Sequence, residues 1–207
     1  TVLANQMLSL AKVEQLRQQP DESVNDFAEV VRSIALELSP LIQQKYPLIA
    51  DAVKRIADPL VRNRATVAGN LAHGDPATDQ PAVMLALGAE VELTGPKGKR
   101  TVPVSAFFLD TLTTALKPDE VLTEIRVPIP PANSGGAYRK IERKVGDFAT
   151  VAVAAQVTLD AKGRCAKAGI GLTNVGTVPL KATEAEAYLV GKALDDATLA
   201  EAGRLAM

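Results

Sequence analysis

The chain has 207 residues, of which 47% are apolar, and its formal net charge is −1 at pH 7. This length is enough for one large domain or two small ones, and the near-neutral charge offers no basic surface for nucleic acid. No uninterrupted apolar run approaches the roughly 20 residues that span a bilayer, and the first seven residues lack the charged leader of a signal peptide, so we expect no transmembrane segment.

Cys165 is the only cysteine of the chain. A single cysteine excludes an internal disulfide, and it excludes a four-cysteine iron–sulfur or zinc site within these residues. We expect Cys165 to be a small core residue. A chain without disulfides also fits a cytoplasmic location.

In chain order, the first expected element is a helix over residues 21–37, because its apolar residues recur at helical spacing. A second helix is expected over residues 47–57. A third is expected over residues 82–87, with Asp79 as its N-cap and Gly88 at its end.

Alternating apolar and polar residues then predict strands. Residues 90–93 and 100–104 form the two arms of an expected hairpin, and residues 121–127 form another strand. Residues 128–136 are dense in proline and glycine, which makes them the clearest linker of the chain. We therefore place a domain boundary after residue 130.

Beyond the linker, three strands are expected over residues 137–143, 150–159 and 165–172. Helices are expected over residues 183–190 and from Asp196 onward. Strands followed by helices predict a small α+β domain.

The most informative stretch is a turn of small residues at positions 66–70, followed by a polar loop that Asp75 and Pro76 close. Small residues let a backbone approach an anion closely enough for its N–H groups to donate, and Thr, Asn and Asp add side-chain hydrogen bonds. The pattern therefore suits a cofactor that carries phosphate.

The motif Thr-x-x-Gly-Asn followed by Asp-Pro-x-x-Asp resembles the second flavin-binding segment in the FAD subunits of molybdenum hydroxylases. These are the medium subunits of aerobic carbon monoxide dehydrogenase and its relatives, and the middle domain of xanthine dehydrogenase. The resemblance runs from about Ser39 to about Arg204 and includes residues 57–64, 116–122 and 137–149 in the family's order. The motif at residues 143–149 is more similar to that of the carbon monoxide dehydrogenase branch than to that of xanthine dehydrogenase.

The resemblance implies an α+β fold in which an FAD-binding α/β domain, at residues 39–130, precedes a small α+β domain at residues 131–207. The smaller domain is expected to hold a three-stranded antiparallel sheet and helices. Residues 1–38 do not match the family, and its first glycine-rich flavin segment has no counterpart here. We therefore expect a portion of the subunit, with an incomplete C-terminal domain.

By resemblance, the turn contacts the FAD diphosphate and Asp79 contacts a hydroxyl or ring N–H of the cofactor, since a diphosphate would repel a carboxylate. Leu122 would pack near the isoalloxazine, and Lys140 would stabilise the anionic reduced flavin. No catalytic residue and no metal ligand is expected. The expected cofactor-binding residues are Thr66, Val67, Ala68, Gly69, Asn70, Asp75, Asp79, Leu122, Tyr138 and Lys140.

These assignments have structural alternatives. Residues 66–70 can form a plain strand-to-loop turn without a cofactor. Asp79 can cap a helix, and Asp75 can shape its loop. Leu122 can be a core residue, Lys140 an exposed strand lysine, and Tyr138 either a cover for the ring edge or part of an amphipathic surface.

Three further positions bear on the interpretation of the motif as a flavin-binding segment. The family usually has glycine where this chain has Ala68, and a left-handed backbone there would cost about 1 kcal/mol. His73 is the only histidine, but flavin re-oxidation needs no general base. Arg62 could reach a phosphate or make a surface contact.

The resemblance implies an electron-transfer subunit of a molybdopterin-dependent dehydrogenase. Substrate would be oxidised at a molybdenum–pterin centre on a large subunit. Electrons would then pass through [2Fe–2S] clusters on a small subunit to FAD on this chain, and from there to an external acceptor. A dimer of heterotrimers is expected, either in the cytoplasm or at the inner face of the membrane.

Two alternatives remain open. The first is a stand-alone FAD-dependent reductase of related fold, such as one acting on a nucleotide-sugar, although the chain offers no convincing acid or base for a substrate. The second is a flavin-free scaffold or assembly subunit, which the missing first flavin segment favours. The substrate and the terminal acceptor cannot be read from this chain.

Overall fold

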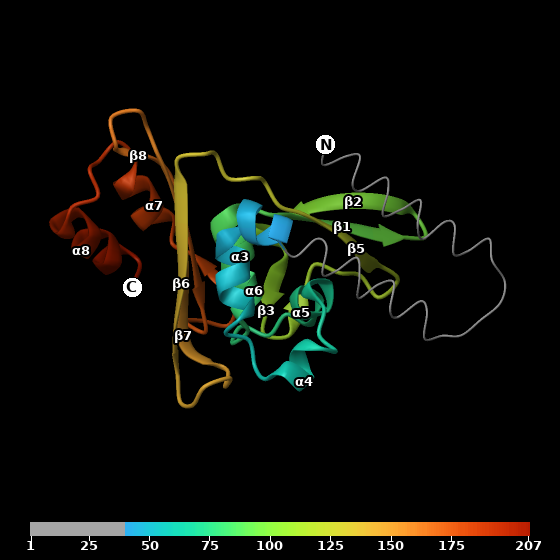
Figure 1. The fold of residues 1–207 in the computed structure, drawn as a ribbon. Helices are drawn as coiled ribbons and strands as arrows, with labels where there is room; N and C mark the ends of the chain where they lie inside the picture. The colour runs from blue at the N-terminus through green and yellow to red at the C-terminus, as the bar shows by residue number, and fades with distance from the viewer. Residues whose placement is uncertain (1–39) are drawn as a thin grey trace. The chain divides into compact units, whose positions relative to one another are not determined.

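The computed structural model describes residues 40–207, so the helix expected over residues 21–37 lies outside the described part. Residues 45–207 form one compact unit in which a long antiparallel sheet lies between two groups of helices (Figure 1). None of the helices in the described part is both long enough and apolar enough to cross a membrane.

Four short helices form the first part of this unit: α3 (Pro47–Val53), α4 (Pro59–Arg62), α5 (Val67–His73) and α6 (Asp79–Leu87). Helix α3 ends four residues before the predicted position, and Ala57, the last residue of the predicted helix, has a left-handed φ of 42°. Asp58 is extended, and its side chain caps α4 by accepting from the amide of Val61 at 2.9 Å.

The turn predicted at residues 66–70 is instead the start of α5. Thr66 is the N-cap of this helix, and Gly74 ends it in the left-handed conformation. Helix α6 ends at Gly88 as predicted, but its N-cap is Thr78, so the expectation that Asp79 is the cap is wrong by one position. Asp79 is instead the first helical residue, where a carboxylate is favourable.

The first sheet has the antiparallel order β2-β1-β5. The predicted hairpin is confirmed by β1 (Glu90–Gly95) and β2 (Gly98–Pro103), and β5 (Val121–Arg126) is the predicted third strand. Three short elements were not predicted: the 3₁₀ helix η1 (Val104–Ala106) and the pair β3 (Phe108–Asp110) and β4 (Thr113–Thr114).

The second sheet has the antiparallel order β6-β7-β8-β9. Its three long strands confirm the predicted ones, and a short fourth strand extends them. The first strand begins at Ser134, inside the segment predicted as a linker. The elements of this part are β6 (Ser134–Glu142), β7 (Ala149–Leu159), β8 (Cys165–Thr173), β9 (Leu180–Lys181), α7 (Thr183–Leu189) and α8 (Asp196–Leu205).

Helix α6 is buried along its whole length, between the two sheets. It lies directly on β8 because two glycines of that strand remove the side chains that would separate them. A Cβ on Gly169 would lie 1.9 Å from the carbonyl oxygen of Ala86, and one on Gly171 would lie 2.0 Å from that of Ala82. The helix is thereby held in fixed contact with the sheet.

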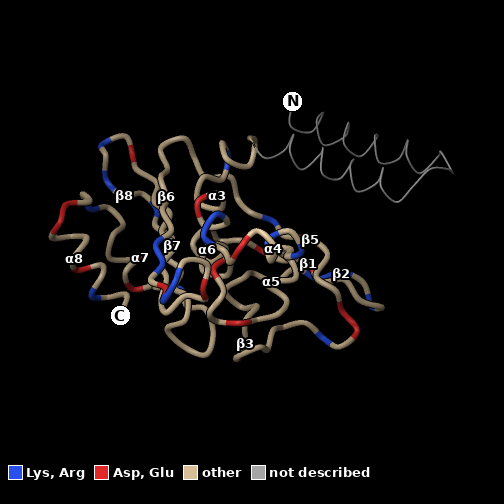
Figure 2. The backbone as a smooth tube through the Cα atoms, turned by 60° about the horizontal axis from the view of Figure 1, so that its bottom comes forward, with Lys and Arg blue, Asp and Glu red and all other residues tan. Residues whose placement is uncertain are grey.

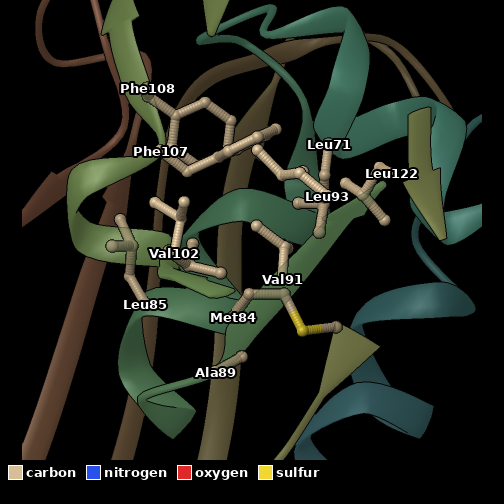
Figure 3. Packing of buried hydrophobic residues seen from close by; sticks show 11 residues of the cluster. Leu71, Met84, Leu85, Ala89, Val91, Leu93, Val102, Phe107, Phe108 and Leu122 are labelled. Carbon is tan, nitrogen blue, oxygen red and sulfur yellow. The ribbon is translucent and has the colours of Figure 1, made fainter. Parts of the chain in front are cut away.

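Three apolar clusters stabilise the unit. The first joins α5 and α6 to the β2-β1-β5 sheet and includes an edge-to-face pair of Phe107 and Phe108 (Figure 3). The second lies between α3, α6 and the long sheet, and the third lies between that sheet and helices α7 and α8. Cys165 is 1% exposed in the third cluster, which confirms the prediction of a core residue.

Candidate functional site

A cavity of about 230 Å³ opens beside the start of α6. Its walls come from the α3–α4 connection, α4, α5, the loop before α6 and the turn between β6 and β7. The volume is somewhat below the 300–1,000 Å³ of typical small-molecule sites, so the cavity suits part of a large cofactor. It is lined by Ile56, Ala57, Val61, Ala65, Asn70, His73, Asp75, Thr78, Asp79, Gly146, Asp147 and Phe148.

Three of the predicted cofactor-binding residues lie together on this cavity: Asn70, Asp75 and Asp79. The side-chain oxygen of Asn70 is buried and accepts no hydrogen bond from any residue in the described part of the chain. A buried acceptor without a donor is costly unless a bound group supplies one. Asp75 also shapes its loop, because its carboxylate accepts from the amide of Ala77 at 2.8 Å.

The start of α5 uses some of its amides within the protein. The hydroxyl of Thr66 accepts from the amide of Gly69 at 3.0 Å, and the carbonyl of Thr66 accepts from the amide of Asn70 at 3.0 Å. A Cβ on Gly69 would lie 2.8 Å from the Thr66 hydroxyl oxygen, so glycine leaves room for the cap. The amide of Gly69 is therefore occupied.

The backbone amides of the two residues before Gly69, unlike that of Gly69, have no acceptor within the described residues. The amides of Val67 and Ala68 donate to no acceptor within residues 40–207, as expected for the first turn of a helix. Ala68 is helical, and it is not among the described residues with positive φ. The left-handed backbone that would have made alanine costly does not occur at this position, so Ala68 carries no such cost.

Arg62 points its guanidinium at the protein backbone. Its Nη1 donates to the carbonyl oxygens of Ile56 at 2.5 Å and Ala57 at 2.7 Å. These contacts hold the α3–α4 connection against α4, so Arg62 shapes a wall of the cavity.

Asp79 and Tyr138 form a buried pair beneath the cavity. The hydroxyl of Tyr138 donates a hydrogen bond to the Asp79 carboxylate. Burial is the main reason why the pKa of Asp79 is raised, and it also raises the pKa of Tyr138. Tyr138 is 0% exposed, so the alternative that it belongs to an amphipathic surface is wrong.

Lys140 is two residues further along β6, and its side chain is only 1% exposed, so it is not an exposed strand lysine. Its ammonium donates to the carbonyl oxygens of Arg55 and Asp147, both at 2.9 Å, and to the Asp79 carboxylate at 3.3 Å. A carboxylate oxygen of Glu142 lies 3.1 Å away. Charges of both signs are thus paired where β6 meets α6.

Glu142 and Asp147 did not emerge from the sequence as site residues. Glu142 had a detectable signal, because Tyr138, Lys140 and Glu142 alternate along β6 and so share one face of the strand. The contribution of Asp147 to the ammonium is a backbone carbonyl, which side-chain chemistry does not reveal.

The predicted residue Leu122 lies apart from this group, and His73, which was not predicted as a site residue, lies at its rim. Leu122 is 8% exposed, belongs to the first apolar cluster opposite Leu93, and is not among the residues that line the cavity. His73 is exposed at the end of α5, on the cavity rim. A larger, more open hollow of about 700 Å³, next to residues 132–135 and 159–163, contains none of the predicted residues.

The groups facing the cavity fit a neutral part of a flavin dinucleotide. Asp75 and Asp79 can accept from hydroxyl or ring N–H groups, as can Asn70, while neither Lys nor Arg lines the cavity. Phe148 is 61% exposed at the opening and offers an apolar surface. Basic and acidic positions are interspersed along the described chain (Figure 2), and no group of three or more metal-ligating side chains occurs within residues 40–207.

Comparison with known families gives two matches that meet near the predicted boundary. Residues 3–130 match the FAD binding domain in molybdopterin dehydrogenase, and residues 136–207 match the CO dehydrogenase flavoprotein C-terminal domain. The first match begins at residue 3, within the segment that the sequence analysis left outside the resemblance.

Individual relatives agree with the family matches. The carbon monoxide dehydrogenase medium chain of Afipia carboxidovorans is 47% identical over 172 residues, which are 83% of this chain and 59% of the relative. That of Hydrogenophaga pseudoflava is 45% identical over 155 residues, 75% of this chain and 54% of the relative. The chain thus spans little more than half the length of these curated relatives.

A solved structure gives the same result. Carbon monoxide dehydrogenase from Hydrogenophaga pseudoflava, in a form that lacks the Mo-pyranopterin moiety of the molybdenum cofactor, aligns with a TM-score of 0.79 at 46% identity. The alignment covers 83% of this chain and 59% of that one. The chain therefore belongs to the FAD-binding family of molybdopterin dehydrogenases, with a C-terminal domain of the CO dehydrogenase flavoprotein type.

Proposed function

We propose that this chain binds FAD and serves as the electron-transfer subunit of a multi-subunit molybdopterin-dependent dehydrogenase related to carbon monoxide dehydrogenase. The observation that carries the proposal is the cavity at which Asn70, Asp75 and Asp79 of the matched FAD-binding domain come together. FAD supplies the redox chemistry when bound, and the protein supplies binding and orientation.

The charges of the site indicate how the cofactor would be divided over it. The neutral, hydroxyl-bearing or ring N–H groups of FAD would face Asp75, Asp79 and the free acceptor of Asn70. The diphosphate would avoid those carboxylates and face the amides of Val67 and Ala68, with Thr66 and Gly69 shaping the turn. The predicted flavin contacts of Leu122 and Tyr138 remain proposals. The ammonium of Lys140 donates three hydrogen bonds within the protein, so its predicted contact with the flavin is not part of this proposal.

We also propose the domain boundary after residue 130, with FAD binding in residues 39–130 and the smaller domain in residues 131–207. The gap between the two family matches supports it. The first match begins at residue 3, so it supports the boundary near residue 130 but not a separate segment over residues 1–38.

The proposed partners are a large molybdopterin-binding subunit and a small subunit with [2Fe–2S] clusters, arranged as a dimer of heterotrimers. The relatives are named medium chains of carbon monoxide dehydrogenase, which supports a heteromeric complex. The single cysteine of this chain is consistent with clusters on another polypeptide. A cytoplasmic complex, peripheral at most to the inner face of the membrane, is proposed.

The test is to purify the full chain, alone and with its co-expressed partner subunits, and to titrate each preparation with FAD. We expect flavin absorbance to stay with the protein after removal of free FAD, and a molybdopterin-binding subunit to co-purify. A complex that forms but never retains flavin would support the flavin-free scaffold instead. Flavin retained by a chain that captures no subunit, and that turns over a small substrate alone, would support the stand-alone reductase.

A further inference from the structure

We propose that Lys140 is a positioning residue whose ammonium clasps together three of the segments that form the walls of the cavity. The inference rests on the proposed function, because it assigns that cavity to the flavin. It differs from the role implied by the resemblance, in which the lysine acts on the flavin itself.

The three hydrogen bonds of Lys140 reach three separate segments. Arg55 belongs to the α3–α4 connection and directly precedes the cavity residues Ile56 and Ala57. Asp147 belongs to the turn between β6 and β7 and itself lines the cavity. Asp79, the third acceptor, begins α6 on the cavity floor. One side chain thus links walls that are distant in sequence.

The ammonium has no donor left for a ligand in this arrangement. A lysine carries three N–H groups, and these three contacts use all of them at 2.9, 2.9 and 3.3 Å. The side chain is 1% exposed. Contact between Lys140 and a flavin atom would require one of the wall contacts to break.

Two carboxylates beside the Lys140 ammonium add ion pairing to its hydrogen bonds. The buried ammonium lies 3.3 Å from the Asp79 carboxylate and 3.1 Å from that of Glu142. A buried charge is costly unless it is paired. Without the ammonium, two carboxylates would face each other across the floor of the cavity, and their repulsion would push α6 and β6 apart.

A second feature shows how closely two of the walls approach each other. Gly146, in the β6–β7 turn, has a φ of +83°, and a Cβ there would lie 3.1 Å from the carbonyl oxygen of Ala57. The rest of the turn is poorly buried, since Val145 is 95% exposed and Phe148 is 61% exposed. The turn therefore depends on the clasp to stay against the α3–α4 connection.

The test compares Lys140→Met with the matched control Lys144→Met in the full chain. Methionine keeps much of the side-chain length but removes the charge and all donors. Lys144 is exposed in the same turn and makes no side-chain hydrogen bond or ion pair within the described residues. Three quantities are measured: amide hydrogen exchange of the flavin-free chain, the dissociation constant for FAD, and the reduction potential of the bound flavin.

For Lys140→Met we expect faster exchange over residues 55–58 and 144–148. FAD affinity should fall on the order of tenfold or more, as for loss of a hydrogen bond to a charged group. At saturating FAD the reduction potential should equal that of the wild type, because the ammonium does not touch the ring. Lys144→Met should match the wild type in all three measurements.

Unchanged hydrogen exchange over residues 55–58 and 144–148 would contradict the proposal that Lys140 holds these segments together. So would a lowered reduction potential with unchanged FAD affinity, because that pattern means direct contact with the flavin. If Lys140→Met fails to fold, the double variant Lys140→Met with Glu142→Gln removes one of the opposed carboxylates and is tested in the same way. If the wild type binds no FAD even with its partner subunits, the proposed function fails, while hydrogen exchange still decides whether Lys140 is the clasp.

Discussion

The hydroxyl of Tyr138 donates a hydrogen bond to the carboxylate of Asp79, which joins the middle of β6 to the first residue of α6. Tyr138 is 0% exposed and Asp79 is 6% exposed. The pair therefore fixes the floor of the cavity from inside the protein, and it is the place where stability and cofactor binding meet.

The pH dependence of stability tests the environment of Asp79. Its pKa is raised above the ordinary value, first by burial, while the hydrogen bond from Tyr138 opposes that shift. A raised folded pKa means that the contribution of Asp79 is fully present below about pH 4 and is lost as the pH rises through the folded pKa. We expect wild-type stability relative to Asp79→Asn to fall as the pH rises from about 4 to about 7.

The measurement is urea unfolding of both proteins across this range, with Asp75→Asn as the control. If wild-type stability instead rises relative to Asp79→Asn over the same interval, the pKa of Asp79 is not raised in the folded protein.

The contact between α6 and β8 predicts a large effect from one methyl group. Gly171→Ala places a Cβ 2.0 Å from the carbonyl oxygen of Ala82, so the helix must shift or the strand must bend. We expect a loss of about 1–3 kcal/mol in the free energy of unfolding, as for other overpacked cores. Thermal and denaturant unfolding measure it.

Gly203→Ala in α8 is the matched control for that substitution. A Cβ at Gly203 meets no atom within 4 Å, and alanine is the better helix former by up to about 1 kcal/mol. The control should be unchanged or more stable. An equally stable Gly171→Ala protein would show that α6 does not lie on the sheet as described.

Glu120 gives a second pH test with the opposite sign. Arg100 donates to both carboxylate oxygens of Glu120, at 2.8 and 2.6 Å, and the amide of Lys117 donates at 2.9 Å. These hydrogen bonds, that of Arg100 first, lower the pKa of Glu120 to about 2. A lowered folded pKa means that the stabilisation is present above about pH 4.3 and is lost as the pH falls.

Wild-type protein should therefore be more stable than Glu120→Gln at neutral pH, and the two should converge as the pH falls from about 5 to about 2. Circular dichroism during denaturant titration follows this difference. If the difference in stability stays constant through the acid range, the ion pair of Arg100 and Glu120 does not hold the turn before β5 against β2.

Much of the fold could be predicted from local patterns in the sequence. Alternation identified β1 and β2, and the glycine at the left-handed position 88 correctly marked where α6 ends. These features depend on neighbouring residues alone, so a single sequence contains them.

Helix α5 could not be predicted in the same way. Its residues are small and show no apolar period, and Leu71 is its only buried residue. Packing of that leucine in the first apolar cluster, together with the Thr66 cap, decides the conformation. Tertiary context here overrides a composition that is typical of a turn.

The site was predicted in its parts but not in its connections. The motif identified Asn70, Asp75 and Asp79, which line one cavity. The acceptors of Lys140 were not foreseen, because Asp79 is 61 residues and Arg55 is 85 residues away in sequence. Contacts at that separation follow from the arrangement of α3, α6 and β6, which no local pattern records.

The central claim, that FAD occupies the cavity beside α6, is tested most directly by FAD binding to wild type, Asn70→Ala and the exposed control Asn63→Ala. The Asn70 side-chain oxygen lines the cavity and is one of the buried acceptors that lack a donor among residues 40–207, so a bound flavin would supply one. We expect Asn70→Ala to bind FAD roughly tenfold more weakly or worse and Asn63→Ala to bind like wild type. Equal dissociation constants for all three proteins, measured by flavin fluorescence under the same conditions, would contradict this account of the site.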